Sequence, residues 1–143
     1  MPKPEHPRPE SFLAAAQDRA ADAQSLFDAG RHASAIWIAG IAIEAMLRGY
    51  HRRSTDQLDT GHNLKQLFRA SGFGERVPAP RAPDVAAAMS LLFASWRHRF
   101  RYDPAETVLR IADIPPRLAE RHARRVMNAM WTIVNEGVSR WPS

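Results

Sequence analysis

The chain has 143 residues, 45% of them apolar and 24% charged, a composition typical of a single globular domain with its own core. It contains no cysteine, which excludes a disulfide scaffold, a thiolate metal site and a cysteine nucleophile. The formal net charge is +5, and only Lys3 and Lys65 of the 20 basic residues are lysines. Arginine suits bidentate recognition of phosphate or carboxylate, although a high-GC genome produces the same excess. The charge permits nucleic-acid binding without requiring it.

The N-terminus has no apolar segment of the kind found in signal peptides. The longest apolar stretch is about a dozen residues, too short to span a bilayer, and it contains Glu44. Scattered single histidines do not have metal-ligand spacing. We therefore expect a cytoplasmic protein with no membrane partner, no metal and no cofactor.

The first part of the chain predicts two long helices. Residues 1–9 are expected to form a flexible lead, and residues 10–141 a single helical-bundle domain. The first helix should run from about residue 10 to 29, with Glu10 or Ser11 as N-cap and Gly30 after its end. The second, residues 32–53, is apolar all round in its middle, which predicts an innermost helix. Gly40 within it should let a neighbouring element approach closely.

The remainder predicts one short helix and two long ones. A helix over residues 62–70 should be capped by His62 and Asn63 and stopped at Gly72, and a proline-rich connection should follow at 75–83. Further helices are expected at 83–96 and 116–140, with 97–115 irregular. No segment alternates like a strand. The expected fold class is all-α, a four- to five-helix up-and-down bundle.

Glu44 is an acid inside the apolar run Ala35–Leu47. An ionised carboxylate there is unfavourable unless it is paired or hydrogen-bonded. Its partner should come from elsewhere in the chain, with Arg101 the first choice and His62 the second. We therefore expect a buried polar cluster of Glu44, His62, Asn63 and Arg101, with Tyr102 nearby.

Residues 96–104 form the densest cationic and aromatic segment, in which arginines alternate with His98, Phe100 and Tyr102. Arginine with aromatic side chains suits phosphate contacts and base stacking. The alternative is a helix-exit loop whose aromatic residues cover the core. Further basic runs lie at the end of the second helix and along the fifth, where they are Arg117, Arg121, Arg124 and Arg125. If such runs were adjacent in space, they would form a phosphate-binding patch. The binding candidates are Arg48, Arg52, Arg53, Arg97, Arg99, Arg101 and Tyr102.

The common enzyme templates are absent: there is no glycine-rich phosphate loop, no paired metal-binding histidines and no serine nucleophile elbow. The remaining catalytic candidates are Arg97 with His98, and Arg117 with His122. Residues at i and i+5 of a helix do not share a face well, so the second pair is expected to be a chance match.

Three segments in order resemble the HEPN superfamily. They are the small-apolar helix Ala35–Arg48 with its embedded Glu44, the turn Gly61-His62-Asn63-Leu64, and the step Arg101-Tyr102-Asp103. The resemblance implies a four- or five-helix bundle, often dimeric, and frequently active in prokaryotic defence or toxin–antitoxin systems. Catalytic members are metal-independent ribonucleases with an arginine, four to six residues, then a histidine. Here His98 directly follows Arg97, which departs from that pattern.

The favoured hypothesis is a non-catalytic, homodimeric HEPN-like binding domain for nucleic acid, a nucleotide or a partner protein. Two alternatives stay open: a metal-independent ribonuclease, and a structural adaptor bundle.

Overall fold

The structure, a computed structural model, describes residues 7–54, 63–97, 100 and 102–142, and only the backbone of Arg53 and Ser54. Within these ranges it is α-helical and contains no strand. The elements are α1 (Pro9–Asp28), α2 (His32–Ser54), α3 (Leu64–Ser71), α4 (Phe73–Arg76), α5 (Ala82–Ser95), α6 (Ala105–Ile111), the 3-10 helix η2 (Pro116–Leu118) and α7 (Ala119–Ser139). The expectation of an all-α bundle is confirmed.

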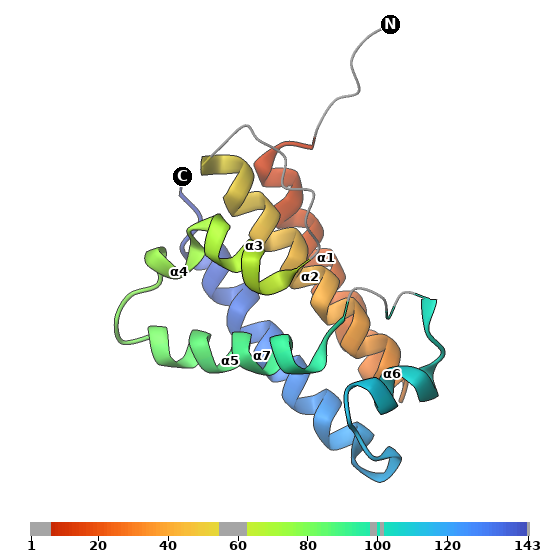
Figure 1. Ribbon diagram of the computed structural model, residues 1–143. Coiled ribbons are helices and arrows are strands. Elements are labelled where there is room, and N and C mark those ends of the chain that lie inside the picture. Colours follow the sequence, from red (N-terminus) through yellow and green to blue (C-terminus); the bar gives the residue numbers. More distant parts are fainter. Residues whose placement is uncertain (1–6, 55–62, 98–99, 101, 143) are drawn as a thin grey trace, which may run out of the picture.

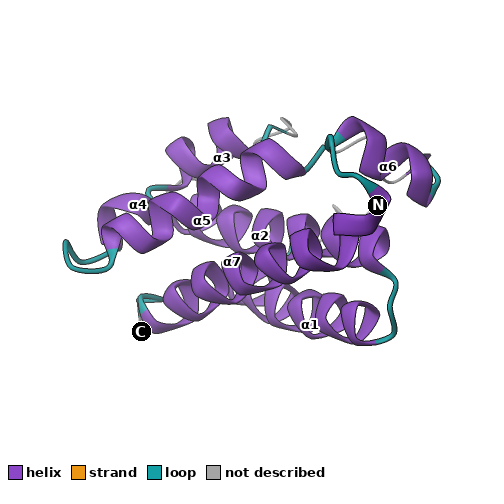
Figure 2. Cartoon of the chain, turned by 90° about the horizontal axis from the view of Figure 1, so that it is seen from below, coloured by secondary structure: helices purple, strands orange, loops and turns teal. Residues whose placement is uncertain are grey.

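The bundle has three layers, seen most clearly in Figure 2. Helices α2 and α7 lie side by side in the middle layer and run in the same direction (Figure 1). Helix α1 pairs with α2 as an antiparallel hairpin on one side, and Gly30, with φ of 80°, makes the tight turn between them. Helices α3, α4 and α5 cover the other side. The placement of α2 confirms that its all-apolar middle marks the innermost position.

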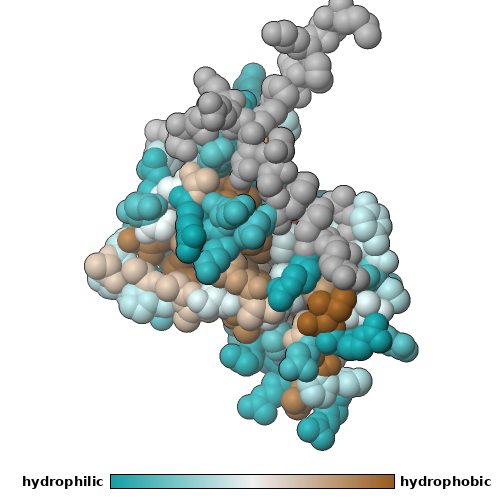
Figure 3. Space-filling view, viewed as in Figure 1, coloured by the Kyte–Doolittle hydropathy of each residue, from teal (hydrophilic) through white to brown (hydrophobic). Residues whose placement is uncertain are grey.

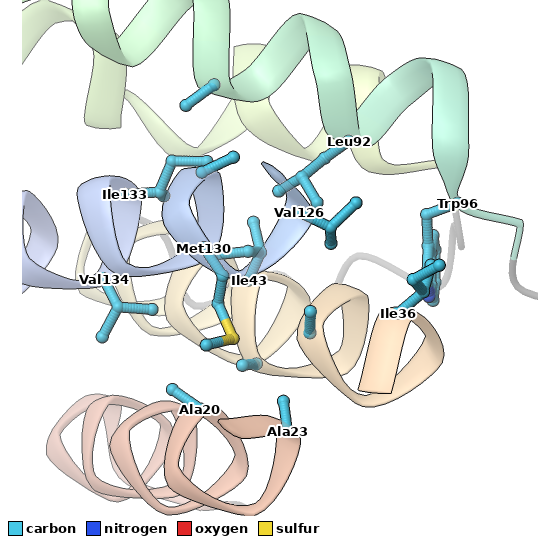
Figure 4. Packing of buried hydrophobic residues seen from close by; sticks show 14 of the residues in the cluster. Ala20, Ala23, Ile36, Ile43, Leu92, Trp96, Val126, Met130, Ile133 and Val134 are labelled. Carbon is cyan, nitrogen blue, oxygen red and sulfur yellow. The ribbon is translucent and has the colours of Figure 1, made fainter. Parts of the chain in front are cut away.

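The core lies where these layers meet (Figure 4). Small residues of α1 face the middle layer, and larger aliphatic residues of α2, α5 and α7 interdigitate above them. The following are almost completely buried: Ala16, Ala20, Ala23, Ile36, Ile43, Leu92, Val126, Met130, Ile133 and Val134. Alanine at this spacing lets α1 approach closely, because little side-chain volume separates the two helix backbones.

Gly40 provides the close approach that the sequence predicts. The indole of Trp96, the residue after α5, lies directly over it, so that a Cβ added at Gly40 would overlap the ring. The indole Nε1 also donates a hydrogen bond to the carbonyl oxygen of Trp37, at 3.0 Å. The end of α5 is therefore fastened to the middle of α2.

Several element boundaries differ from the sequence-based expectations. The N-cap of α1 is Arg8 with Pro9 at the first helical position, so neither Glu10 nor Ser11 caps it. A one-turn helix, α4, follows Gly72, although the sequence predicts a helix stop there and a proline-rich connection from residue 75. Helix α6 lies in the segment expected to be irregular. Its seven residues are too few to show helical periodicity, and only Val108 is buried.

Two carboxylates among the described residues are buried. Glu44 is 9% exposed and accepts a hydrogen bond from Nη2 of Arg48 at 2.9 Å. One partner of Glu44 is thus on its own helix, and the expected partners from elsewhere in the chain, Arg101 and His62, lie outside the described residues. Glu136 of α7 is 7% exposed and receives Arg140 Nε at 2.9 Å and Arg81 Nε at 3.4 Å. These hydrogen bonds, that of Arg140 first, lower the pKa of Glu136 despite its burial.

Among the described helices, none combines the length and apolar character needed to cross a membrane.

Candidate functional site

A cavity of about 330 Å³ lies beside the first turns of α7. One wall is α7 itself, and the other is the turn that leads from α6 to η2. We call it the α7 pocket. Its lining residues are Ala112, Asp113, Ile114, Pro115, Leu118, Arg121, His122 and Arg125.

Helical spacing brings the basic side chains of this pocket together. Arg121 and Arg125 are four residues apart, and His122 is three residues before Arg125, so the three share one side of α7. The opposite side of the same turns carries Ala119, Ala123 and Val126, which are buried in the core. Burial of that side holds α7 in place and leaves Arg121 and Arg125 exposed at the pocket.

His122 joins the pocket to α5. It is half-buried, and its Nε2 lies 2.9 Å from the hydroxyl oxygen of the buried Ser95. Burial, with a smaller contribution from the Arg125 guanidinium, lowers the pKa of His122 below 6.5. The imidazole is therefore mostly neutral at pH 7 and can accept a proton.

The second wall depends on how α6 ends. Asp113 has φ of 57°, the left-handed conformation, and its N–H donates to the carbonyl of Arg110. The N–H of Ile114 donates to the carbonyl of Leu109, which completes a Schellman-type C-cap. Glycine usually occupies this position. The residue here is an aspartate, which lines the pocket together with Arg121 and Arg125.

The pocket carries a net positive charge. Neither Arg121 nor Arg125 forms an ion pair with any residue that the structure describes. By contrast, Arg124 on the neighbouring face of α7 is paired with Glu120 at 3.0 Å. Two guanidinium groups without a carboxylate partner suit an anion, above all a phosphate.

The catalytic candidates from sequence fall in different places. His122 lines the α7 pocket, whereas Arg117 does not. Arg117 lies in η2, before α7 begins, and not inside a long helix as expected. Arg97 is exposed, and its Nη1 donates to the carbonyls of Phe93 and Trp96 at the end of α5. His98 lies outside the described residues.

The binding candidates at the end of α2 are far from the α7 pocket. Tyr50, in the same part of α2 as Arg48 and Arg52, hydrogen-bonds Gly137 near the end of α7. Gly137 and Arg121 are roughly 24 Å apart at a helical rise of about 1.5 Å per residue. The basic runs of the second and the last helix therefore lie at opposite ends of the bundle and do not form one patch.

The other predicted residues are only partly placed. The Asn63 side chain accepts hydrogen bonds from the N–H groups of Lys65 and Gln66, so it is the N-cap of α3. Tyr102 is 80% exposed and is not part of a buried cluster. His62, Arg99 and Arg101, and the side chain of Arg53, lie outside the described residues. The predicted pairing of Glu44 with His62 or Arg101 stays a prediction.

Sequence reasoning missed most of the α7 pocket. The spacing of Arg121, His122 and Arg125 is a usable signal, but the second wall of the pocket is the turn after α6, a helix that the sequence does not predict. The residues described include no group of three or more acidic or histidine side chains placed to hold a metal ion.

Comparison with known proteins gives one match. The family model described as the HEPN domain matches residues 9–141, nearly the whole chain. No curated protein and no solved structure gives a significant match.

Proposed function

Because the chain belongs to the HEPN domain family, we propose that it binds RNA through phosphate contacts in the α7 pocket. The observation that carries this proposal is the convergence of Arg121 and Arg125 on one cavity with no carboxylate paired to either among the described residues. His122, which lines the same cavity, adds a hydrogen-bonding group. Phosphate oxygens are the ligand for which guanidinium geometry is best suited.

Salt-dependent binding tests the proposal. Full-length protein is titrated into a fluorescently labelled single-stranded RNA, and anisotropy is measured over a series of salt concentrations. The logarithm of the association constant should fall linearly with the logarithm of salt concentration, with a slope of about −0.7 per phosphate contact. Arg121→Gln and Arg125→Gln should each weaken binding and reduce that slope by about 0.7. Absence of binding at low ionic strength would refute the proposal.

Matched controls locate the site. Arg19→Gln and Arg76→Gln remove exposed arginines elsewhere on the surface and should leave the slope unchanged. Arg52→Gln tests the opposite end of the bundle. If Arg52→Gln reduces the slope while Arg121→Gln does not, the RNA site is at the end of α2 instead.

A ribonuclease activity is the second candidate, favoured by the neutral His122 beside two guanidinium groups. In such a reaction His122 would take the proton of a ribose 2′-hydroxyl while its oxygen attacks the adjacent phosphorus and forms a 2′,3′-cyclic phosphate. The P–O5′ bond would break, the 5′-oxygen would take a proton from water, and the arginines would stabilise charge on the attacked phosphate. Cleavage of labelled RNA by purified protein should then disappear in His122→Asn and persist in His51→Asn, at the far end of α2. His98→Ala tests the other predicted histidine. Cleavage that survives every one of these substitutions would indicate a contaminating nuclease.

Homodimer formation, a protein partner, and a role in defence or toxin–antitoxin systems are further proposals. Trp37, Ile38 and Ile41 of α2 keep part of their surface outside the core, which supports an additional contact there. Sedimentation equilibrium of the full chain would give the mass in solution, and a monomer at high concentration would remove the dimer proposal.

A further inference from the structure

A second cavity, of about 620 Å³, lies on the other side of the turn that bounds the α7 pocket. We call it the α6 pocket. Its lining is Ala105, Glu106, Leu109, Arg110, Asp113, Ile114, Pro115 and Pro116. Figure 3 shows apolar surface, in brown, at the position of α6 with hydrophilic residues around it. The volume lies within the range of about 300–1,000 Å³ that is usual for small-molecule sites.

The two pockets share one wall. Asp113, Ile114 and Pro115 line both of them, so the two cavities are adjacent. A ligand in the α6 pocket can therefore extend across these residues toward Arg121 and Arg125, which line the α7 pocket. A nucleotide matches this pair of cavities. Its base, a flat ring with polar edges, suits the α6 pocket, and its phosphate suits the arginines of the α7 pocket.

The polar groups of the α6 pocket define which ring it fits. Glu106 and Asp113 offer carboxylate oxygens, which accept hydrogen bonds, and Arg110 offers guanidinium N–H groups, which donate. None of these three side chains forms an ion pair within the described part of the chain, although Glu106 and Arg110 are four residues apart on α6. Their hydrogen-bonding capacity is therefore available to a ligand.

Guanine is the base that matches this set. It presents two adjacent donors, N1–H and the N2 amino group, which one carboxylate can accept together. It also presents two acceptors, O6 and N7, to which arginine donates in the commonest specific base contact. Adenine and cytosine each offer a single amino group beside a ring-nitrogen acceptor, and uracil offers a single N3–H donor between two carbonyl oxygens, so none of the three gives a carboxylate two adjacent donors. The apolar faces of Leu109, Ile114 and the prolines would enclose the ring.

From this geometry we infer that the α6 pocket binds guanine, with the attached phosphate in the α7 pocket, and so gives the domain a preference for guanine nucleotides. This inference rests on the proposed phosphate contacts of Arg121 and Arg125. The same chemistry is offered by a guanosine within RNA and by free guanosine monophosphate, and the two are distinguished experimentally.

The test uses short labelled RNAs of uridine with one central position varied as G, A, C or U, titrated into the full-length protein. The G-containing RNA should bind about tenfold or more tightly than the U-only RNA, the range expected for one bidentate base contact. Glu106→Gln and Arg110→Gln should each abolish this preference, so that the variant binds the G-containing and the U-only RNA with the same affinity. Glu75→Gln and Arg76→Gln, on α4, are the matched controls and should retain the preference.

Asp113→Gly removes the third polar group of the pocket and should reduce the preference for the G-containing RNA. Glycine suits the left-handed backbone at that position, so a reduced preference cannot be attributed to unfolding. Free guanosine monophosphate competing with the G-containing RNA, with uridine monophosphate failing to do so, would identify the mononucleotide as a sufficient ligand. Competition only by RNA would identify the polynucleotide as the source. Both results support a guanine site.

The inference fails if all four RNAs bind equally and Arg121→Gln weakens them all, which leaves the proposed function intact. A different result, no RNA binding at low salt, would refute both the proposed RNA binding and the proposed guanine site. A guanine preference that survives in both Glu106→Gln and Arg110→Gln would also overturn the inference, because the base would then be recognised elsewhere.

Discussion

Replacement of Gly40 by alanine tests the packing that positions the end of α5. Alanine is favoured over glycine inside a helix by about 1 kcal/mol, so helix propensity alone predicts that Gly40→Ala is stabilising. The structure predicts the opposite sign. The added Cβ would overlap the Trp96 indole, a rigid ring held by its hydrogen bond to the Trp37 carbonyl.

The size of the effect follows from the rigidity of the neighbour. Overpacking a core costs about 1–3 kcal/mol, and a ring that cannot rotate away belongs at the upper end of that range. After subtraction of the propensity gain of about 1 kcal/mol, Gly40→Ala should lower the free energy of unfolding by about 2 kcal/mol. Urea titration followed by circular dichroism measures it.

Two further variants test whether contact with Trp96 causes the destabilisation expected for Gly40→Ala. Gly137→Ala makes the same change in α7, where the Cβ meets the Met46 side chain, which is flexible and can move. It should therefore cost less than Gly40→Ala. In a Trp96→Ala background the obstruction is gone, so Gly40→Ala should become stabilising by about 1 kcal/mol. A Gly40→Ala protein as stable as the wild type would refute the proposed contact with Trp96.

Three further predictions concern individual side chains. Glu136→Gln should lower the free energy of unfolding by about 2 kcal/mol at pH 7, because it removes charge-assisted hydrogen bonds that include Arg140. Since the folded-state pKa of Glu136 is lowered, this difference from wild type should be fully present above about pH 4.5 and vanish as acid urea titrations pass below the folded-state pKa. Asp113→Gly should raise the free energy of unfolding by about 1 kcal/mol by relieving the left-handed conformation, and a decrease would contradict that account. RNA affinity should rise as the pH falls from 7 toward 5, because a bound phosphodiester raises the lowered pKa of His122. His122→Asn should remove that dependence in anisotropy titrations.

Some features of the fold could be predicted because they depend on local chemistry. The apolar middle of α2 indicated a central helix, and Gly40 within it indicated a close contact. The identity of the contacting residue, Trp96, could not be read from the pattern, since it depends on where α5 ends in space. Glu44 was correctly expected to be buried, but the nearest basic residue on its own helix, Arg48, was assigned to ligand binding instead of to pairing.

Other features depend on tertiary structure alone. Glu136 is as buried as Glu44, yet polar residues such as Asn135 and Ser139 flank it, so no uninterrupted apolar run marks it as buried. One of its partners, Arg140, is a helical neighbour, whereas Arg81 approaches from the turn before α5. Nothing in the sequence near either residue indicates that contact.

The candidate site also combines features that the local sequence predicts with features that depend on tertiary structure. The basic side of α7 is visible as the spacing of Arg121, His122 and Arg125. A row of arginines on a helix is usually a solvated surface, however, and it becomes a pocket only because a second wall faces it. That wall exists because the chain leaves α6, which ends at Ile111, through Asp113 in the left-handed conformation and then passes beside α7. Since the same turn separates the α7 pocket from the α6 pocket, the conformation of Asp113 determines the spacing between them. Any selectivity of this domain for a nucleotide should therefore be more sensitive to the length of that turn than to the number of arginines on α7.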